Sequence, residues 1–350
     1  MEFTKGEKKQ YDRHLILSEI GEVGQLKLKQ AKVLVIGAGG LGCPILQYLT
    51  AAGVGTIGII DDDVVAQSNL QRQILYTIDD IGFSKSEIAA KRLSKLNPFV
   101  KFDVHTNKLT KENALSLFTK YDVILDGSDN FSTRYLTNDA AVITNKPLVY
   151  GAIFKFEGQV SVFNYQQSAT YRCLYPEPPK PKEMPNCSEI GVLGILPGII
   201  GCLQANEALK IILGIGNVLA NKLLLYSALN ASQTIINFQK DTTLKITDLE
   251  NNYDLFCGIT FDIEISKADL QKNIEKYNLL DVREEWEREE FHIGGLHIPL
   301  HELADKIHLI PKDKELVVYC KSGLRSKKAI SFLKEKKMNI QLFNLKNGCF

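Results

Sequence analysis

The sequence has no excess of either charge. Among 350 residues, 42 Lys and Arg balance 41 Asp and Glu, which gives a formal net charge of +1. This balance argues against nucleic acid and against an anionic membrane as partners. Any acidic ligand must therefore be met by a local group of basic side chains.

A signal peptide and an uninterrupted apolar run are also missing. The first residues, MEFTKGEKKQYDRH, contain no apolar core. The most apolar stretch, 192–213, is interrupted by Gln204, Asn206, Glu207 and Lys210. The seven cysteines are odd in number and irregularly spaced, which fits a reducing compartment. We therefore expect a cytoplasmic protein without a membrane span.

Short apolar runs alternate with helical patterns over the first 150 residues. We expect strands at 32–36, 56–60, 101–105, 122–126 and 147–150, and helices at 41–52 and 84–96. Ser84 with Glu87 forms a capping signature for the second helix, which Asn97-Pro98 ends. This alternation predicts an α/β fold with a parallel sheet.

The pattern changes from residue 151 onward. AIFKFEGQVSVFNY alternates as paired antiparallel strands do, and a polar, proline-rich crossover loop follows at 166–189. An apolar helix at 193–213 and strands at 222–227 and 233–238 complete a first domain, residues 1–240, with a mixed, mainly parallel sheet. Residues 241–260 have the composition of a linker, and a second βα pattern gives a smaller domain at 261–350.

The stretch VLVIGAGGLG, residues 33–42, is an apolar strand that runs into a Gly-x-Gly-x-x-Gly turn. Gly37 permits the tight bend, Gly39 lets backbone amides approach phosphate oxygens, and Gly42 allows close packing of helix on strand. Asp61, at the end of the second strand, can accept hydrogen bonds from ribose hydroxyls. The pattern predicts a nucleotide site but leaves the nucleotide open, so an NAD-dependent oxidoreductase is one alternative.

Charged residues follow the neighbouring strands. Arg72 can fork across phosphate oxygens, Lys85 can place a positive charge beside them, and Asp129 can hold Mg²⁺. Because the carboxyl ends of parallel strands meet at one edge, we expect these groups to face one crevice. Their combination favours a triphosphate.

Six stretches of the first domain match one known family. They are YDRHL (11–15), VLVIGAGGLGCPILQYLTAAGVG (33–55), DDDVVAQSNLQRQILY (61–76), GFSKSE (82–87), LDGSDNFSTR (125–134) and GQVSVF (158–163). Through them, residues 10–240 resemble the MoeB/ThiF (HesA) family of ATP-dependent activators of sulfur-carrier proteins, which are relatives of ubiquitin-activating enzymes with a Rossmann-like domain. The resemblance implies that ATP and Mg²⁺ are bound by Gly40, Asp61, Asp63, Ser68, Asn69, Arg72, Lys85, Asp129 and Asn130.

The resemblance also implies a reaction and an assembly. The substrate is the C-terminal glycine carboxylate of a ubiquitin-fold carrier such as MoaD or ThiS, and a carboxylate attacking the α-phosphorus gains chiefly from alignment and charge neutralisation. Arg13 is expected to reach the nucleotide of the partner subunit in a homodimer. Cys187 matches a family position where a cysteine joins the carrier or relays sulfur. A non-catalytic scaffold for a ubiquitin-like protein is the second alternative.

A zinc site is not expected, although relatives often carry two Cys-x-x-Cys pairs. TYRC (170–173) and DLFC (254–257) each keep only the second cysteine. Cys173 and Cys257 thus offer two thiolates where a structural zinc site needs four ligands. Cys43 and Cys202 lie on apolar helix faces, so we expect them in the core.

In the second domain, VVYCKSGLRS describes a strand that delivers Cys320 to a short turn opening a helix near Leu324. Backbone amides and a helix N-terminus would face the sulfur, and Arg325 would add a cation, which favours a thiolate or a persulfide. Together with LLDVREEWEREEFHIGGLHIPL, this pattern resembles rhodanese domains from about 262 to the end. The sequence stops at NLKNGCF, short of the usual rhodanese end, and Cys349 is interpreted as incidental.

The two resemblances together imply a fused adenylyltransferase and sulfurtransferase, as in molybdopterin and thiouridine synthesis. A persulfide on Cys320 would attack the carrier adenylate and leave a thiocarboxylate. The sequence does not say whether the carrier serves molybdopterin, thiamine or another pathway. A cysteine desulfurase or thiosulfate is the expected sulfur donor.

Overall fold

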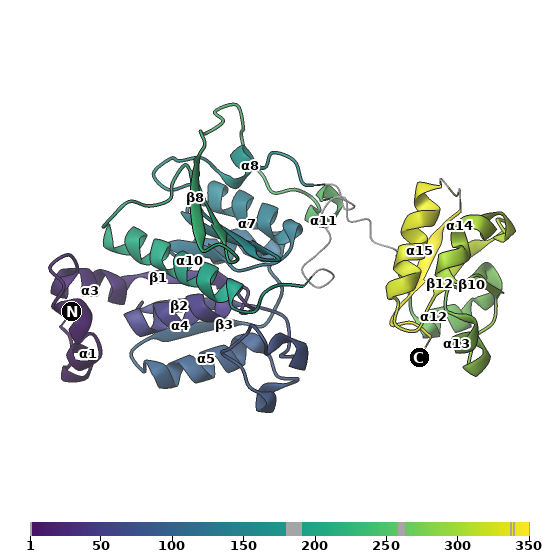
Figure 1. Ribbon diagram of the computed structural model, residues 1–350, viewed down its shortest axis with the longest axis horizontal. Coiled ribbons are helices and arrows are strands. Elements are labelled where there is room, and N and C mark those ends of the chain that lie inside the picture. Colours follow the sequence, from purple (N-terminus) through teal and green to yellow (C-terminus); the bar gives the residue numbers. More distant parts are fainter. Residues whose placement is uncertain (1, 180–190, 258–262, 337, 339, 350) are drawn as a thin grey trace. The chain divides into compact units, whose positions relative to one another are not determined.

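The computed structural model describes residues 2–179, 191–257, 263–336, 338 and 340–349. The chain divides into two compact units, Met1–Gly258 and Ile259–Phe350 (Figure 1). Each unit has its own sheet and its own buried clusters.

The first unit is built on an eight-stranded sheet in the order β3-β2-β1-β4-β5-β6-β7-β8. Pairing is parallel from β3 to β5 and antiparallel from β5 to β8, which confirms the mixed, mainly parallel sheet predicted from the sequence. The strands are β1 (Lys32–Ile36), β2 (Thr56–Ile60), β3 (Lys101–His105), β4 (Val123–Asp126), β5 (Leu148–Phe154), β6 (Glu157–Phe163), β7 (Lys222–Ser227) and β8 (Ser232–Asn237).

Helices cover both faces of this sheet. Because side chains alternate along a strand, Val33 and Val35 of β1 join one buried cluster and Leu34 and Ile36 join the other. The first cluster includes residues of α3 (Gly21–Gln30), α4 (Gly42–Ala52), α5 (Lys85–Leu96) and α10 (Leu196–Leu213). The second includes residues of α6 (Lys111–Phe118), α7 (Phe131–Ile143), α8 (Tyr171–Leu174) and α11 (Tyr253–Phe256).

α10 is the one helix in the described part of the chain that is long and apolar enough to cross a membrane. Half of its apolar window is buried, and it packs against α4, β5 and β6. Leu196, Ile200 and Ala205 contribute to the first buried cluster. A helix that is apolar on most sides fits this position in a protein core.

Local signals account for several boundaries. The expected strands at 32–36 and 56–60 coincide with β1 and β2, and the Ser84 hydroxyl accepts a hydrogen bond from the Glu87 amide at the start of α5. The sequence pattern does not predict α6, α7 or the N-terminal helices α1 (Lys5–Gln10), α2 (Asp12–Leu15) and α3. In α7 the reason is clear, because Arg134, Asn138 and Asp139 are buried and obscure its apolar period.

Polar contacts hold the end of the first unit. Arg172 of α8 donates to both carboxylate oxygens of Asp139, at 2.8 and 2.7 Å, and to Glu250 at 3.2 Å. The Tyr253 hydroxyl donates to Asp139 at 2.7 Å. Residues 241–257, whose composition predicts a linker, thus contact α7 and α8 of the first unit.

The second unit contains a five-stranded parallel sheet in the order β11-β10-β12-β13-β9. Its strands are β9 (Ile263–Ile265), β10 (Tyr277–Asp281), β11 (Leu296–His297), β12 (Glu315–Tyr319) and β13 (Leu342–Leu345). Its helices are α12 (Lys267–Lys272), α13 (Glu285–Glu290), α14 (Leu303–Lys306) and α15 (Leu324–Glu335). The predicted strands of the Cys320 region and the helix beginning at Leu324 are confirmed as β10, β12 and α15.

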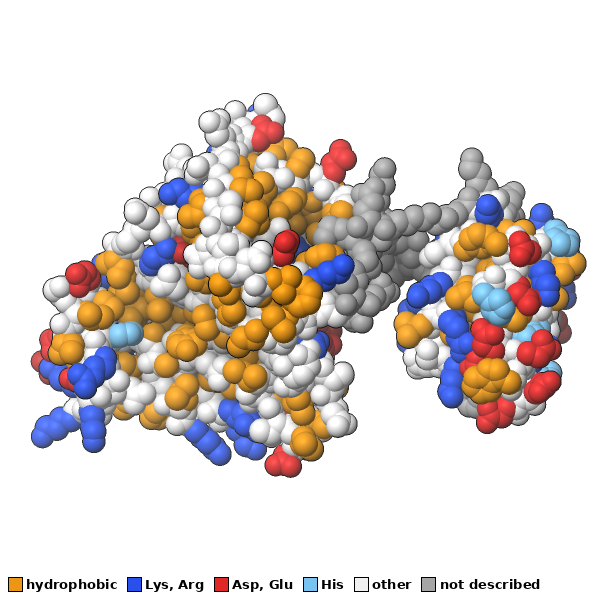
Figure 2. Space-filling view, viewed as in Figure 1, with side chains coloured by type: hydrophobic (Ala, Val, Ile, Leu, Met, Phe, Trp, Pro, Cys, Tyr) orange, Lys and Arg blue, Asp and Glu red, His pale blue; other side chains and the backbone are white. Residues whose placement is uncertain are grey.

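The surfaces of the two units differ. On the face of the first unit seen in Figure 2, apolar side chains spread among uncharged ones, and Leu229, Ile235 and Ile236 of the β7–β8 hairpin are exposed. On the visible face of the second unit, charges of both signs are mixed. Ion pairs such as Lys306–Glu302 and Lys327–Glu264 belong to this second unit.

Candidate functional site

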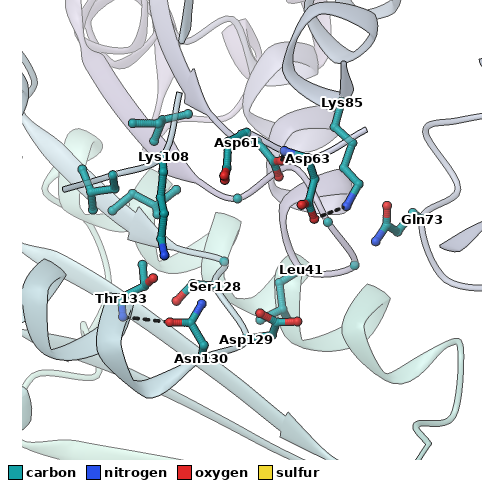
Figure 3. A pocket seen from close by; sticks show the side chains of 18 of the residues that line it. Leu41, Asp61, Asp63, Gln73, Lys85, Lys108, Ser128, Asp129, Asn130 and Thr133 are labelled. Carbon is teal, nitrogen blue, oxygen red and sulfur yellow. Dashed lines mark hydrogen bonds and ion pairs between the residues drawn. The ribbon is translucent and has the colours of Figure 1, made fainter. Parts of the chain in front are cut away.

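A cavity of about 370 Å³ lies at the carboxyl ends of β1 to β4 in the first unit (Figure 3). The edge position is the one expected for ligands of an open α/β sheet. The sequence-predicted residues that line it are Gly37, Gly39, Gly40, Asp61, Asp63, Arg72, Lys85, Asp129 and Asn130. Gly42, Ser68, Asn69 and Arg13 do not line it, and the functional role of each residue in both groups stays a prediction.

The glycine turn has the backbone that its sequence implies. Gly37 has φ +86°, and a side chain at Gly42 would overlap the carbonyl oxygen of Gly37. At Gly39 an added Cβ would meet only the end of Gln73, at 3.5 Å. The turn is thus closed by backbone at Gly42 and open toward the cavity at Gly39, directly before the first turn of α4.

Asp61 joins the second strand to the glycine turn. One carboxylate oxygen accepts a hydrogen bond from the Ala38 amide at 2.7 Å, and the other accepts from the Asp63 amide at 2.8 Å. Burial raises the pKa of Asp61, and these two amide bonds oppose the rise. Each carboxylate oxygen has more than one lone pair, so Asp61 keeps acceptor capacity for a ligand hydroxyl.

Lys85 begins α5 and is held inside the cavity wall. Its side chain is 5% exposed, and its ammonium pairs with Asp63 at 2.8 Å. The hydroxyl of Tyr76 lies 2.7 Å from the carbonyl oxygen of Ala38 and 3.2 Å from that of Lys85. One phenol therefore links the glycine turn to the first residue of α5.

Arg72 and Asp129 stand on other parts of the cavity wall. Arg72 donates to the Ser68 carbonyl at 3.0 Å, so Ser68 contributes to the position of Arg72 although it lies outside the wall. Asn69 accepts from the Ala66 amide at 3.2 Å. Asn130 caps α7 through its side-chain carbonyl, which accepts from the Thr133 amide at 2.9 Å, and Asp129 precedes it as an exposed carboxylate.

Arg13 lies on the short helix α2 and is exposed, outside the cavity of its own chain. Tyr11, the residue before α2, is buried and exchanges hydrogen bonds with Asn97, whose amide also donates to the Thr50 carbonyl at 2.7 Å. The base of the Arg13 segment is therefore anchored in the first unit, while the Arg13 side chain faces solvent.

Several residues of the cavity wall are not predicted by the sequence pattern. They include Gln73, Lys108, Ser128, Thr133 and Arg134. Lys108 follows β3, so the rule that strand ends share an edge could have found it. No comparable signal marks Arg134, which is buried inside α7 with its guanidinium 5.3 Å from the Phe131 ring centre. Its Nε has no hydrogen-bond partner among the described residues.

The second candidate site surrounds Cys320, directly after β12. Its sulfur accepts a hydrogen bond from the Gly323 amide at 3.1 Å and from the Ser326 amide at 3.4 Å, and the Ser326 hydroxyl lies 3.4 Å away. Burial alone would raise the pKa of the Cys320 thiol, but the bonds from the Ser326 hydroxyl and from nearby amides outweigh it and lower this pKa. The expected amide cradle is confirmed.

Arg325 adds a positive charge near the sulfur, as expected, and also pairs with a carboxylate: the hydrogen bond with Glu287 raises its pKa most, and the charge of Cys320 adds to the rise. Its guanidinium forms a two-pronged ion pair with Glu287 of α13, at 2.5 and 2.7 Å. The hydrogen bond from Arg325 lowers the pKa of Glu287 to about 2. The cation is thus largely neutralised by a partner that the sequence pattern did not suggest, and it fixes α13 against the loop of Cys320.

Two known protein families match the chain, one over each of these sites. The ThiF family matches residues 11–245, and the Rhodanese-like domain matches residues 266–350. The chain belongs to the ThiF family. The first match contains the whole cavity, and the second contains Cys320 and the loop that holds it.

Relatives of this ThiF-family chain include proteins with both domains. "Probable adenylyltransferase/sulfurtransferase MoeZ" of Mycobacterium tuberculosis is 44% identical over 95% of this chain and 89% of the relative. "Sulfur carrier protein adenylyltransferase" of Thermus thermophilus is 48% identical over 74% of this chain and 100% of the relative. "Adenylyltransferase and sulfurtransferase MOCS3" of Drosophila sechellia is 39% identical, covering 93% and 78%. The chain is an enzyme, an adenylyltransferase with a sulfurtransferase domain.

Solved structures share the fold of the first unit. The crystal structure of Escherichia coli MccB with MccA-N7isoASN matches with a TM-score of 0.61 and 21% identity, over 70% of this chain and 75% of that one. At this identity the likeness establishes the fold alone.

The other cysteines of the ThiF-family chain differ in how deeply they are buried. Cys43 is buried, as expected, and burial raises its pKa to about 12, whereas Cys202 is only half-buried. Cys349 is buried, and its amide donates to the Cys320 carbonyl at 3.0 Å. Cys187 lies outside the described residues.

Cys173 and Cys257 are the two cysteines that remain of the zinc-binding pairs found in relatives. The Cys173 sulfur accepts from the amides of Thr170 and Asp241, at 3.3 and 3.4 Å, and Cys257 is buried. Within 2–179, 191–257 and the described parts of the second unit, no three His, Cys, Asp or Glu side chains gather as a metal site would require. That the chain binds no zinc stays a prediction.

Proposed function

We propose that this enzyme uses ATP and Mg²⁺ to adenylate the C-terminal glycine carboxylate of a ubiquitin-fold sulfur carrier, MoaD-like or ThiS-like, and that Cys320 then delivers the sulfur. The observation that carries the proposal is the single cavity that joins the glycine turn to Arg72, Lys85 and Asp129. Membership of the ThiF family and the names of the relatives support it.

The glycine turn and the cationic residues account for triphosphate binding. Gly39 leaves room for phosphate oxygens before the N-terminus of α4, which favours anions. Lys85 brings a positive charge that is now balanced by Asp63, and Arg72 presents a planar fork. When a triphosphate enters, it would offer these cations additional negative partners.

The acidic side of the cavity fits Mg²⁺. This ion is commonly held by one or two carboxylates, with water and substrate phosphates as its remaining ligands. Asp129 supplies an exposed carboxylate at the cavity wall, so the donor set agrees with that chemistry although no cage of three such residues exists among the described residues. The ion would neutralise phosphate charge during adenylation.

Adenylation itself needs alignment more than acid–base chemistry. The carrier carboxylate oxygen bonds to the α-phosphorus while the bond to the β-phosphate oxygen breaks, so pyrophosphate leaves and an acyl-adenylate remains. The cations of the wall stabilise the charge that builds up on the phosphate oxygens. We propose that Arg13 of a second copy completes this site in a homodimer, because Arg13 is anchored through Tyr11 yet points to solvent in its own chain.

Sulfur transfer would proceed from the loop that holds Cys320. A donor such as a cysteine desulfurase loads one sulfur on the thiolate, and the outer sulfur of the persulfide attacks the acyl carbon, which releases AMP. The resulting acyl disulfide is cleaved by a second thiol, which leaves a carrier thiocarboxylate and a disulfide on Cys320. Cys187 is our candidate for that thiol. The donors around Cys320 suit the negative charge of a persulfide.

The location of the protein and two alternative functions remain to be considered. We propose a cytoplasmic location, where thiols stay reduced. An NAD-dependent oxidoreductase and a non-catalytic scaffold gain no support from the comparisons, because the relatives are named as transferases.

The test is ATP–pyrophosphate exchange with each candidate carrier in turn, followed by mass detection of the thiocarboxylate. We expect exchange only with a carrier that has its terminal glycine, and a mass gain corresponding to replacement of one oxygen by sulfur. A carrier truncated by its last glycine is the control. Binding of NAD in place of ATP, or exchange without any carrier dependence, would contradict the proposal.

A further inference from the structure

Lys108 is a cation of the cavity wall that has no role in the proposed binding of the triphosphate. It belongs to the loop after β3, together with Asn107 and Leu109, and all three line the cavity. In Figure 3 its side chain extends toward Thr133 and Asn130. Its ammonium makes no hydrogen bond or ion pair with any described residue, whereas the ammonium of Lys85 is paired with Asp63.

The order of groups along the sheet edge indicates what Lys108 would face. Phosphates belong at the glycine turn after β1, and the acid after β2, Asp61, belongs at the ribose. The base must then lie beyond the ribose, away from the phosphates. In Figure 3 Asp61 lies between Lys108 and Lys85, so Lys108 is on the side opposite the phosphate-binding lysine.

The surroundings of Lys108 also fit a base. Leu109 is 5% exposed and offers an apolar surface, while the buried hydroxyl of Ser128 has no hydrogen-bond partner among the described residues. A purine ring has apolar faces and an edge of acceptor nitrogens. An ammonium can donate to such a nitrogen, and a charged donor forms a stronger bond than a neutral one.

We infer that Lys108 binds the base of the nucleotide by donating from its ammonium to a ring nitrogen, and so sets the affinity for the nucleoside part of ATP. This inference rests on the proposed ATP-dependent function. It divides the cationic residues by task, with Lys85 and Arg72 at the phosphates and Lys108 at the base.

The experiment compares Lys108→Met with the wild-type full-length protein in binding ATP, AMP and adenosine, measured by competition against a fluorescent ATP analogue. We expect Lys108→Met to weaken all three ligands by a similar factor, about 10-fold to 100-fold. Arg72→Ala should weaken ATP and leave adenosine unchanged. Lys111→Met, just beyond the cavity wall at the start of α6, is the matched control and should bind like wild type.

The binding data test the role of Lys108 separately from the proposed use of ATP. Wild-type affinity of Lys108→Met for adenosine would overturn the inference, as would a loss confined to ATP, which would place Lys108 at the phosphates. Failure of the wild-type protein to bind ATP would overturn the proposed function instead. Because Lys108 is exposed on a loop, thermal unfolding of the ligand-free variant should match wild type, and Lys108→Arg should retain part of the adenosine affinity.

Discussion

The glycine turn of the first unit and the Cys320 loop of the second are both strand-to-helix connections in parallel sheets, yet they differ in what they enclose. The turn at Gly37–Gly42 borders an open cavity of about 370 Å³. The loop from Cys320 to Gly323 closes on one atom, a sulfur that is reached by two backbone amides and a hydroxyl and belongs to a residue only 1% exposed.

The same kind of strand-to-helix connection thus suits two different anionic groups. Both connections direct backbone amides and a helix N-terminus toward negative charge. In the first unit, charged side chains on neighbouring strands add to the amides, as a polyanion of several phosphates requires. In the second unit, Arg325 forms an ion pair with Glu287, and hydrogen bonds from two amides and a hydroxyl stabilise a single anionic atom.

The largest expected effect separates the two sites by chemistry. Cys320→Ser should reduce thiocarboxylate formation by a factor of about 1,000 or more, because the nucleophile is lost. Carrier-dependent ATP–pyrophosphate exchange should stay at the wild-type rate. Cys349→Ser is the control, since Cys349 contacts Cys320 through its backbone amide. Thiocarboxylate formation by Cys320→Ser at the wild-type rate would show that sulfur takes another route.

The converse change affects the first site. Arg72→Ala should slow pyrophosphate exchange about 100-fold or more, since a charge that stabilises the transition state is removed. Loading of sulfur from thiosulfate onto Cys320 should be unchanged. Lys95→Ala, exposed at the end of α5 and outside the cavity wall, should behave like wild type in both assays. Unchanged exchange in Arg72→Ala would contradict the assignment of the cavity to the triphosphate.

A matched glycine pair tests how tightly the open turn is built. Gly42→Ala should destabilise the first unit by about 2–4 kcal/mol, because its methyl group would overlap the Gly37 carbonyl. Gly39→Ala has space for its methyl group and should fold normally, yet bind ATP more weakly. Chemical denaturation and nucleotide titration of both variants provide the measurement. Equal stability of the two variants would refute this picture of the turn.

The smallest expected effect concerns the closed loop. Ser326→Ala removes a hydrogen bond that favours the Cys320 thiolate, so the pKa of this thiol should rise. The thiolate then forms at higher pH, and sulfur loading should need a more alkaline solution. Thiolate absorbance as a function of pH, taken as a difference from Cys320→Ser, measures the shift. Ser322→Ala, where only the backbone amide contributes, should leave the midpoint in place.

Much of the fold follows from local sequence signals. The apolar strand before Gly37 and the helix capped by Ser84 are confirmed nearly to the residue, because backbone conformation and helix capping are decided within a few positions. The missed helix α7 shows the limit. Its buried Asp139 is satisfied by Arg172 and Tyr253, which lie far away in the sequence, so no local pattern reveals that it belongs inside.

The candidate sites show the same division. Residues at the ends of successive strands, such as Asp61 and Asp129, could be assigned to one crevice from the parallel sheet alone, and they do line one cavity. Pairings across elements could not be predicted. The engagement of Arg325 by Glu287 depends on how α13 packs against the Cys320 loop, and the exposed position of Lys108 depends on the path of a loop between β3 and α6.

The phenol of Tyr76 bears on how the first site can change over time. Its hydroxyl lies within hydrogen-bond distance of the carbonyl oxygens of Ala38 and Lys85, so one side chain connects the glycine turn to the helix that carries the Lys85 ammonium. A substitution that shifts the glycine turn would therefore strain the start of α5, and the reverse also holds. Adaptation to a ligand of different shape is easier through the loop after β3, whose described residues make no hydrogen bond with this phenol.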